Sequence, residues 1–162
     1  MRNAMNVVNI ENARLIFRNF KGAASKFNRE GDRNFSIVLD QEIAQTLAND
    51  GWNVREKPAT EDYPEAMYTL QVKVDFDSIY PPKVVMINSR GQQKILNKDN
   101  VAQLDYADVM TADLTIRPYC WEVGDKKGVK AYLKALYITI QEDLFAEKYA
   151  ALEGPDEEKP FN

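Results

Sequence analysis

The stretch Tyr68-Thr69-Leu70-Gln71-Val72-Lys73-Val74-Asp75-Phe76 decides the fold class, because its polar and apolar side chains alternate along its whole length. Alternation with a period of two places successive side chains on opposite faces of an extended chain. A run of this length predicts a β-strand with one buried face and one face in water.

Other segments with the same alternation or with clustered β-branched and aromatic residues predict more strands. They are residues 7–20 (long enough to bend), 35–39, 84–88, 109–119 and 129–140. Turn-forming residues separate them, with loops expected at 21–33, 56–65 and 80–82 and a turn at 124–128. We therefore expect a mainly β fold with a few short helices, built as a small barrel or a sandwich.

Helices are expected at three places. Asp40 can cap a helix over residues 41–48 that ends near Gly51, with Ile43 and Leu47 on its buried face. Residues 142–152 predict a second helix, and residues 99–104 predict a helical turn.

The composition indicates one globular domain of an intracellular protein. The chain has 162 residues, 44% of them hydrophobic, and shows no repeat, so we expect one domain over 1–152 followed by a flexible acidic tail over 153–162. It has one cysteine and no histidine, which excludes zinc sites built from Cys and His and every His-dependent catalytic triad. Neither a signal peptide nor a membrane span is visible, so a soluble cytoplasmic protein is predicted.

Residues 13–35, ARLIFRNFKGAASKFNREGDRNF, mix aromatic and basic side chains as single-stranded nucleic-acid binders do. Phe17 and Phe35 lie in strand-like runs and are expected in the core, whereas Phe20 and Phe27 are candidates for stacking on bases. The basic side chains fit either solvated surface or phosphate contact, and the phosphate candidates are Arg18, Lys21, Lys26, Arg29 and Arg33.

Residues 115–137, TIRPYCWEVGDKKGVKAYLKALY, predict a hairpin with a functional face. A turn between Asp125 and Lys126 would pair strand residues so that one face carries three aromatic and three basic side chains. A slip of one residue would put the side chains of the two strands on opposite faces. A second reading puts Tyr119 and Trp121 in the core and leaves the lysines as ordinary surface. On the shared face, the stacking candidates are Tyr119, Trp121 and Tyr132, the phosphate candidates are Arg117, Lys130 and Lys134, and the expected pairs are Trp121–Lys130, Tyr119–Tyr132 and Arg117–Lys134.

Two pairs of carboxylates are close in sequence and could hold Mg²⁺ for phosphoryl chemistry. They are Asp75 with Asp77 and Asp105 with Asp108. Nothing in the sequence places these four side chains in one site, so a metal-dependent nuclease is only a minor alternative.

Several stretches resemble a family of small single-stranded DNA-binding proteins encoded by tailed bacteriophages. They are ENARLIFRNFKG, GDRNFSIVLD, DGWNV, LTIRPYCWEV and KAYLKALYITI, and they extend over most of residues 10–150. The resemblance implies an OB-like fold, which is a five-stranded Greek-key barrel that binds oligonucleotides across one face. It also implies coating and protection of exposed single strands during phage DNA replication or recombination, in the host cytoplasm.

The C-terminal tail resembles the acidic segments, closed by phenylalanine, with which such proteins recruit replication and repair partners. The acids are Asp156, Glu157 and Glu158, and the apolar tip is Phe161. Asn162 follows that phenylalanine, which departs from the pattern. The tail is also expected to compete with DNA for the basic surface.

The sequence therefore predicts a non-catalytic, sequence-tolerant single-stranded DNA-binding protein without a cofactor or metal. Its expected partners are single-stranded DNA and, through the tail, replication or recombination proteins, with self-association left open. The alternative is an interaction or DNA-mimic inhibitor module, in which the acidic tail and loop 56–65 dock a host enzyme.

Overall fold

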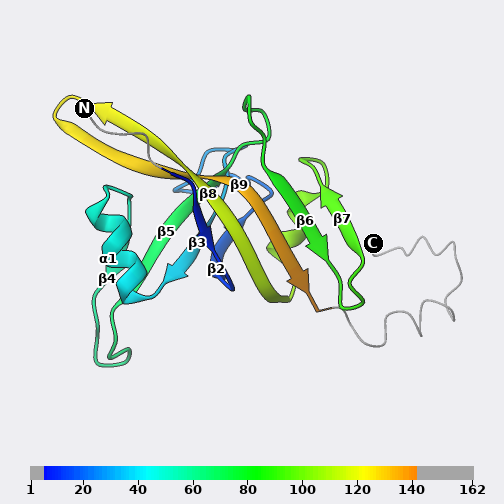
Figure 1. The fold of residues 1–162 in the computed structure, drawn as a ribbon, viewed down its shortest axis with the longest axis horizontal. Coiled ribbons are helices and arrows are strands. Elements are labelled where there is room, and N and C mark those ends of the chain that lie inside the picture. Colours follow the sequence, from blue (N-terminus) through cyan, green and yellow to red (C-terminus); the bar gives the residue numbers. More distant parts are fainter. Residues whose placement is uncertain (1–5, 142–162) are drawn as a thin grey trace, which may run out of the picture.

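The computed structural model describes residues 6–141 and shows the expected mainly β architecture (Figure 1). The predicted second helix at 142–152, the domain boundary at 152 and the tail at 153–162 lie outside these residues. The elements are β1 (Val8–Ile10), β2 (Arg14–Asn19), β3 (Arg33–Leu39), α1 (Gln41–Asn49), β4 (Arg55–Lys57), β5 (Met67–Val74), β6 (Lys83–Ile87), β7 (Gln93–Leu96), the 3-10 helix η1 (Val101–Asp105), β8 (Val109–Val123) and β9 (Lys126–Ile140).

The strands form one mixed sheet whose main path runs β1-β8-β9-β5-β3-β2. The pairing of β5 with β9 is parallel, and the other pairings along this path are antiparallel. The two ends of the path, β1 and β2, are consecutive in the chain, so the sheet curls back on itself. This is the strand order of a five-stranded OB-like barrel, and β4, β6 and β7 are additions to it.

The first strand of this barrel bends between β1 and β2, as the length of the run at 7–20 predicted. Asn12 lies in the left-handed region with φ of 50°, a conformation that asparagine tolerates better than most residues. Its backbone N–H donates to Asp113 Oδ1 at 2.8 Å, and the N–H of Ala13 donates to the carbonyl of Ala112 at 2.7 Å. These bonds hold the bend against β8.

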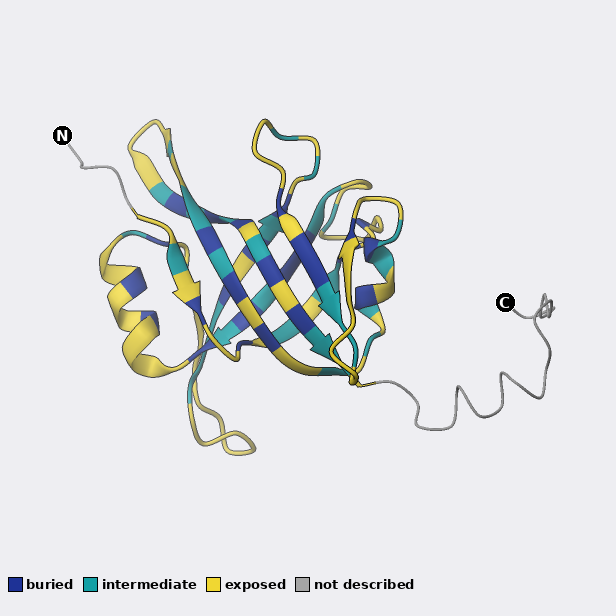
Figure 2. Cartoon of the chain, turned by 45° about the vertical axis from the view of Figure 1, so that its right-hand side comes forward, coloured by how far each residue is buried: buried dark blue, intermediate teal, exposed yellow. Residues whose placement is uncertain are grey.

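The barrel core is built by the alternating strands. In the opening stretch, Leu70, Val72 and Val74 are buried, while Gln71 and Lys73 face outward. Figure 2 shows the same alternation of buried and exposed residues along the long strands. The core therefore fills one side of the sheet and leaves the outer side for polar and aromatic residues.

Helix α1 begins and ends where the sequence predicted. The Asp40 side chain accepts a hydrogen bond from the N–H of Ile43 at 2.8 Å, and Gly51 follows the helix with φ of 93°. The predicted buried pair was wrong in one member, because Ile43 is 40% exposed and Ala44 is buried with Leu47. The helix presents only a narrow stripe to the barrel, and this stripe uses positions three apart.

Strand β2 contains a bulge that overturns one core prediction. Ile16 pairs with Ser36 and Asn19 with Asn34, so two residues of β2 lie opposite one residue of β3. Phe17 occupies the bulge with φ of 51° and is 75% exposed, although the alternating pattern placed it in the core. An inserted residue breaks the period of two, which a sequence pattern does not reveal.

Two short strands were not predicted. The strand β4 contains Glu56 and Lys57, which were expected in a loop, and β7 had no expected element. Each pairs along one edge only, β4 with β5 and β7 with β6. Their side chains are mostly exposed, so neither has the apolar face by which a strand is recognised in a sequence.

Candidate nucleic-acid interface

The β8–β9 hairpin places aromatic and basic side chains on one outer face. Its turn is Gly124-Asp125, and the cross-strand pairs are Arg117–Tyr132, Tyr119–Lys130 and Trp121–Gly128. Residues directly opposite each other in an antiparallel pair share a face. In Figure 1 the end of this hairpin reaches out beyond the rest of the sheet, above α1.

The predicted register of this hairpin was wrong by two residues, but its shared face is confirmed. A shift by an even number of residues keeps every side chain on its original side of the sheet. Lys134 is the exception. It is skipped at a bulge, where Leu133 pairs with Ile116 and Ala135 with Thr115, so Lys134 lies directly opposite no residue of β8.

The hairpin side chains contact one another. The rings of Tyr119 and Tyr132 lie edge to face with centroids 5.6 Å apart, and the Arg117 guanidinium carbon lies 5.4 Å from the Tyr132 centroid. Burial raises the pKa of the Tyr132 hydroxyl, with a further contribution from the charge of Asp75. Tyr132 therefore stays neutral at physiological pH, and Tyr119 remains 49% exposed beside it.

One row of paired residues runs from this face across the barrel, and its member Asn34 is buried where it bonds to the loop between β2 and β3. Arg117 pairs with Tyr132, Tyr132 with Lys73, Lys73 with Asn34, and Asn34 with Asn19. The row crosses β8, β9, β5, β3 and β2, a path of about 19 Å at about 4.8 Å per strand. It joins the hairpin to the loop that follows β2.

Lys73 was missed by sequence reasoning. It occupies the polar side of the opening strand, which by itself indicates only a solvated position. It becomes a candidate because the parallel pairing of β5 with β9 places it next to Tyr132. The sequence therefore predicted a solvated position for Lys73, but it did not show that Lys73 lies next to Tyr132.

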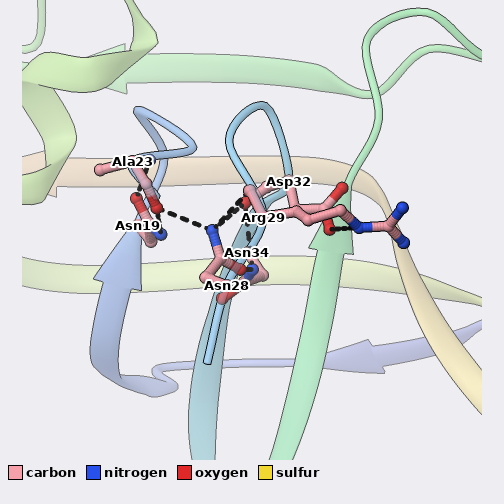
Figure 3. A network of polar contacts seen from close by, with 6 residues as sticks. All are labelled: Asn19, Ala23, Asn28, Arg29, Asp32 and Asn34. Carbon is pink, nitrogen blue, oxygen red and sulfur yellow. Dashed lines mark hydrogen bonds and ion pairs between the residues drawn. The ribbon is translucent and has the colours of Figure 1, made fainter. Parts of the chain in front are cut away.

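The loop between β2 and β3 is held by asparagine side chains (Figure 3). The Asn28 amide donates to the carbonyls of Ala23 at 2.8 Å and Asp32 at 3.0 Å, and Asn34 donates to Asn28 Oδ1 at 2.9 Å. Asn19 exchanges two hydrogen bonds with the backbone of Ala23. The two asparagines that end the row thus fix the loop, whose exposed candidates are Lys21, Lys26, Phe27 and Arg29.

Phe27 is the most exposed of the predicted stacking residues, at 91%, and the Lys26 ammonium lies 5.6 Å from its ring centroid. Arg29 forms an exposed ion pair of 4.0 Å with Asp32. An exposed pair of this kind is weakly stabilising and leaves the guanidinium available to other anions.

Phe20 has a structural position instead of the predicted stacking one. Its side chain is 0% exposed and stacks on Phe35, with centroids 5.0 Å apart. The N–H of Phe20 donates to Asp105 Oδ1 at 2.6 Å. A ring enclosed in this way has no face to offer to a base.

Two of the predicted phosphate contacts also bind the protein itself. Arg18 Nη1 donates to the carbonyls of Leu104 and Ala107, both at 2.8 Å. Arg33 Nη1 donates to the carbonyl of Phe20 at 2.7 Å. Both guanidinium groups join β2 and β3 to neighbouring segments.

Three of the four carboxylates considered for metal binding form hydrogen bonds or ion pairs within the protein. Asp105 accepts from Phe20 and Lys21, Asp75 accepts from the N–H of Asp77 at 3.0 Å, and Asp77 lies 3.1 Å from Lys98 Nζ. Between residues 6 and 141, no three His, Cys, Asp or Glu side chains are grouped so that they could hold a metal ion.

In the part of the chain that the structure describes, no helix is both long and apolar enough to cross a membrane.

Solved structures with a similar fold come from bacteriophage Enc34. Its single-stranded DNA-binding protein aligns with a TM-score of 0.51 and 13% identity, covering 96% of this chain and 90% of that chain. The same protein in complex with ssDNA aligns with a TM-score of 0.51 and 14% identity, covering 85% of this chain and 88% of that chain. These likenesses support the fold. No curated protein matches the sequence.

A family model described as "Putative phage ssDNA-binding domain" matches residues 1–159. The match includes the whole barrel, the hairpin and the asparagine-held loop. The chain belongs to this family of phage single-stranded DNA-binding domains.

Proposed function

We propose that the chain binds single-stranded DNA across the outer face of the barrel, from the β8–β9 hairpin to the loop that follows β2. The observation that carries this proposal is the row Arg117–Tyr132–Lys73–Asn34–Asn19, with Tyr119 and Trp121 beside it on the hairpin. The family match supports single-stranded DNA as the ligand, and the row of paired residues supports this path.

Binding on this face combines stacking with charge. The rings of Tyr119, Trp121 and Tyr132 stack on bases, while cations follow the phosphates. Stacking is tolerant of sequence because every base has a π-face. The cations proposed for phosphate contact are Arg117, Lys130 and Lys73 on the sheet, Lys134 at its bulge, and Lys21, Lys26 and Arg29 on the loop.

A titration of labelled oligo-dT with the full-length chain at several salt concentrations tests this function. We expect log K to fall with log[salt] with a slope of about −0.7 for each phosphate that is neutralised. Absence of binding at low salt, or an affinity that does not change with salt, would contradict the proposal.

We propose further that the domain coats and protects exposed strands in phage replication or recombination without cleaving them. The match to a family of single-stranded DNA-binding domains supports a non-catalytic role. Incubation of labelled single-stranded DNA with the protein and Mg²⁺, with an EDTA control, should leave the strand intact. Cleavage that requires Mg²⁺ would show a nuclease instead.

The acidic tail is proposed to recruit a replication or recombination protein and to compete with DNA. The support is its sequence, with Asp156, Glu157, Glu158 and Phe161 close together. Deletion of residues 153–162 should tighten oligo-dT binding at low salt and abolish capture of a partner from host lysate. If the deletion changes neither the affinity for oligo-dT nor the capture of a partner, both proposed roles of the tail are contradicted. If the full-length chain captures a partner but does not bind oligo-dT, an inhibitor module is favoured.

A further inference from the structure

Gly128 determines where the Trp121 ring can lie. The two residues are directly opposite each other in the hairpin. A Cβ atom placed on Gly128 would lie 2.9 Å from Cζ2 and 3.0 Å from Cε2 of Trp121. Carbon atoms in contact are normally about 3.5–4.0 Å apart. The indole therefore occupies space that any other residue at position 128 would fill.

Asn53 also borders the space that a Cβ atom on Gly128 would fill. A Cβ atom on Gly128 would also lie 2.6 Å from Asn53 Oδ1. The Asn53 amide oxygen and the Trp121 ring thus both border the space beside the Gly128 Cα atom. A single absent methyl group allows both to approach β9.

The segment that carries Asn53 is fixed to the barrel. The N–H of Asn53 donates to the carbonyl of Val129 at 2.9 Å, and the N–H of Val129 donates to the carbonyl of Gly51 at 2.9 Å. Between them, Trp52 is buried in the core, and its N–H donates to the carbonyl of Leu47 in α1 at 3.0 Å. Helix α1 and its end therefore hold Asn53 against the hairpin.

The Trp121 ring is only half-buried, but its Nε1 is enclosed and has no hydrogen-bond partner among the described residues. Cε2, the atom bonded to Nε1, is one of the two that lie against Gly128. The polar edge of the indole thus lies against Gly128, while the residue as a whole keeps part of its surface exposed. A ring that is fixed along one edge and partly exposed is able to stack on a base.

We propose that Gly128 and Asn53 are positioning residues that seat Trp121 for stacking on a base of bound DNA. The inference rests on the proposed function of the outer face. A purely structural alternative exists, in which Trp121 covers Gly128 to stabilise the hairpin, as aromatic residues do opposite glycines in sheets. The two readings differ in whether Gly128 affects DNA affinity through Trp121.

A double-mutant cycle on oligo-dT affinity distinguishes the two readings. Trp121→Ala should weaken binding by about 5- to 150-fold, which corresponds to about 1–3 kcal/mol for one stacked base. Gly128→Ala should weaken it by about tenfold in the wild-type background and hardly at all in the Trp121→Ala background, because residues that act as a unit are not additive. Asn53→Ala should give a smaller loss, about two- to fivefold, with the same dependence on Trp121.

Gly91→Ala, in the turn between β6 and β7, serves as a control, because a Cβ atom there meets nothing within 4 Å. It should not change affinity, although its φ of 82° will lower stability. Circular dichroism and thermal unfolding show whether each variant folds. If Gly128→Ala does not fold, the Asn53→Ala and Trp121→Ala cycle tests the same coupling.

The results separate the two levels of failure. Absence of oligo-dT binding by the parent chain would contradict the proposed function itself. Binding by the parent and a weakened Trp121→Ala, with Gly128→Ala and Asn53→Ala unaffected, would overturn only the positioning role. An unchanged affinity of Trp121→Ala, or equal losses for Gly128→Ala with and without Trp121, would also overturn it.

Discussion

The stretch 13–35 and the hairpin 115–137 look equivalent in sequence, since both interleave aromatic and basic residues, yet the structure uses them differently. The hairpin places Arg117, Tyr119, Trp121, Lys130 and Tyr132 together on one face. The earlier stretch is divided, because Phe20 is in the core and Arg18 bonds to the protein, whereas Phe27 and Lys26 are exposed. In regularly paired strands every second side chain lies on the same face, whereas a bulge or a loop breaks this alternation.

The largest effect that tests this division is on stability. Phe20→Ala should lower the free energy of unfolding by about 3–5 kcal/mol, as expected for removing a buried phenylalanine. Phe27→Ala in the same loop should leave stability nearly unchanged because its ring is exposed. Urea unfolding of both variants measures the difference, and equal stabilities would mean that Phe20 is not a core residue.

The next effect is on DNA affinity. Tyr119→Ala should weaken oligo-dT binding by about 1–3 kcal/mol if its exposed ring stacks on a base. Tyr63→Ala is the matched control, because Tyr63 is also exposed but lies on the loop between β4 and β5. If Tyr119→Ala and Tyr63→Ala both bind oligo-dT as tightly as the parent, the hairpin ring of Tyr119 does not stack on DNA.

A smaller effect concerns the charge on the row. Lys73→Ala should make the salt slope of oligo-dT binding less steep by about 0.7, which is the value for one phosphate contact. Lys94→Ala, on β7, should leave the slope unchanged. A slope that is the same in Lys73→Ala and in the parent would show that Lys73 contacts no phosphate.

The smallest effect concerns the hydroxyl of Tyr132. Its pKa is raised above the usual value of 10.0 mainly by burial, so the group is neutral at pH 7 in both folded and unfolded chains. Tyr132→Phe should therefore bind oligo-dT like the parent at pH 7. Because the folded state favours the neutral form, its contribution to stability is fully present below pH 10 and is lost as pH rises through the folded pKa.

Unfolding at pH 7 and at pH values above 10 tests the second part of that prediction. The parent should lose more stability than Tyr132→Phe over this interval, since the variant has no hydroxyl to ionise. Equal losses would show that ionisation of Tyr132 is not coupled to folding.

Much of the fold was predictable from local patterns. The alternation at 68–76, the capping residue Asp40 and the long run at 7–20 led to the correct strands, helix and bend. The misplacement of Phe17 and the two-residue error in the hairpin register have a common origin. Both depend on bulges and turn geometry, where one residue more or less changes the partner while the composition stays the same.

The sequence by itself determined the class of the fold, because alternating side-chain types along a strand set which face is buried. The family and its ligand, single-stranded DNA, followed from the stretches that resemble it and from the family match over residues 1–159. The tertiary structure alone decided which aromatic and basic residues lie together. Lys73 joins Tyr132 only through a parallel pairing between strands far apart in sequence. Asn53 meets Trp121 only because α1 returns the chain to β9 at Gly128. Contacts between distant segments depend on the packing of the whole barrel, which no local pattern contains.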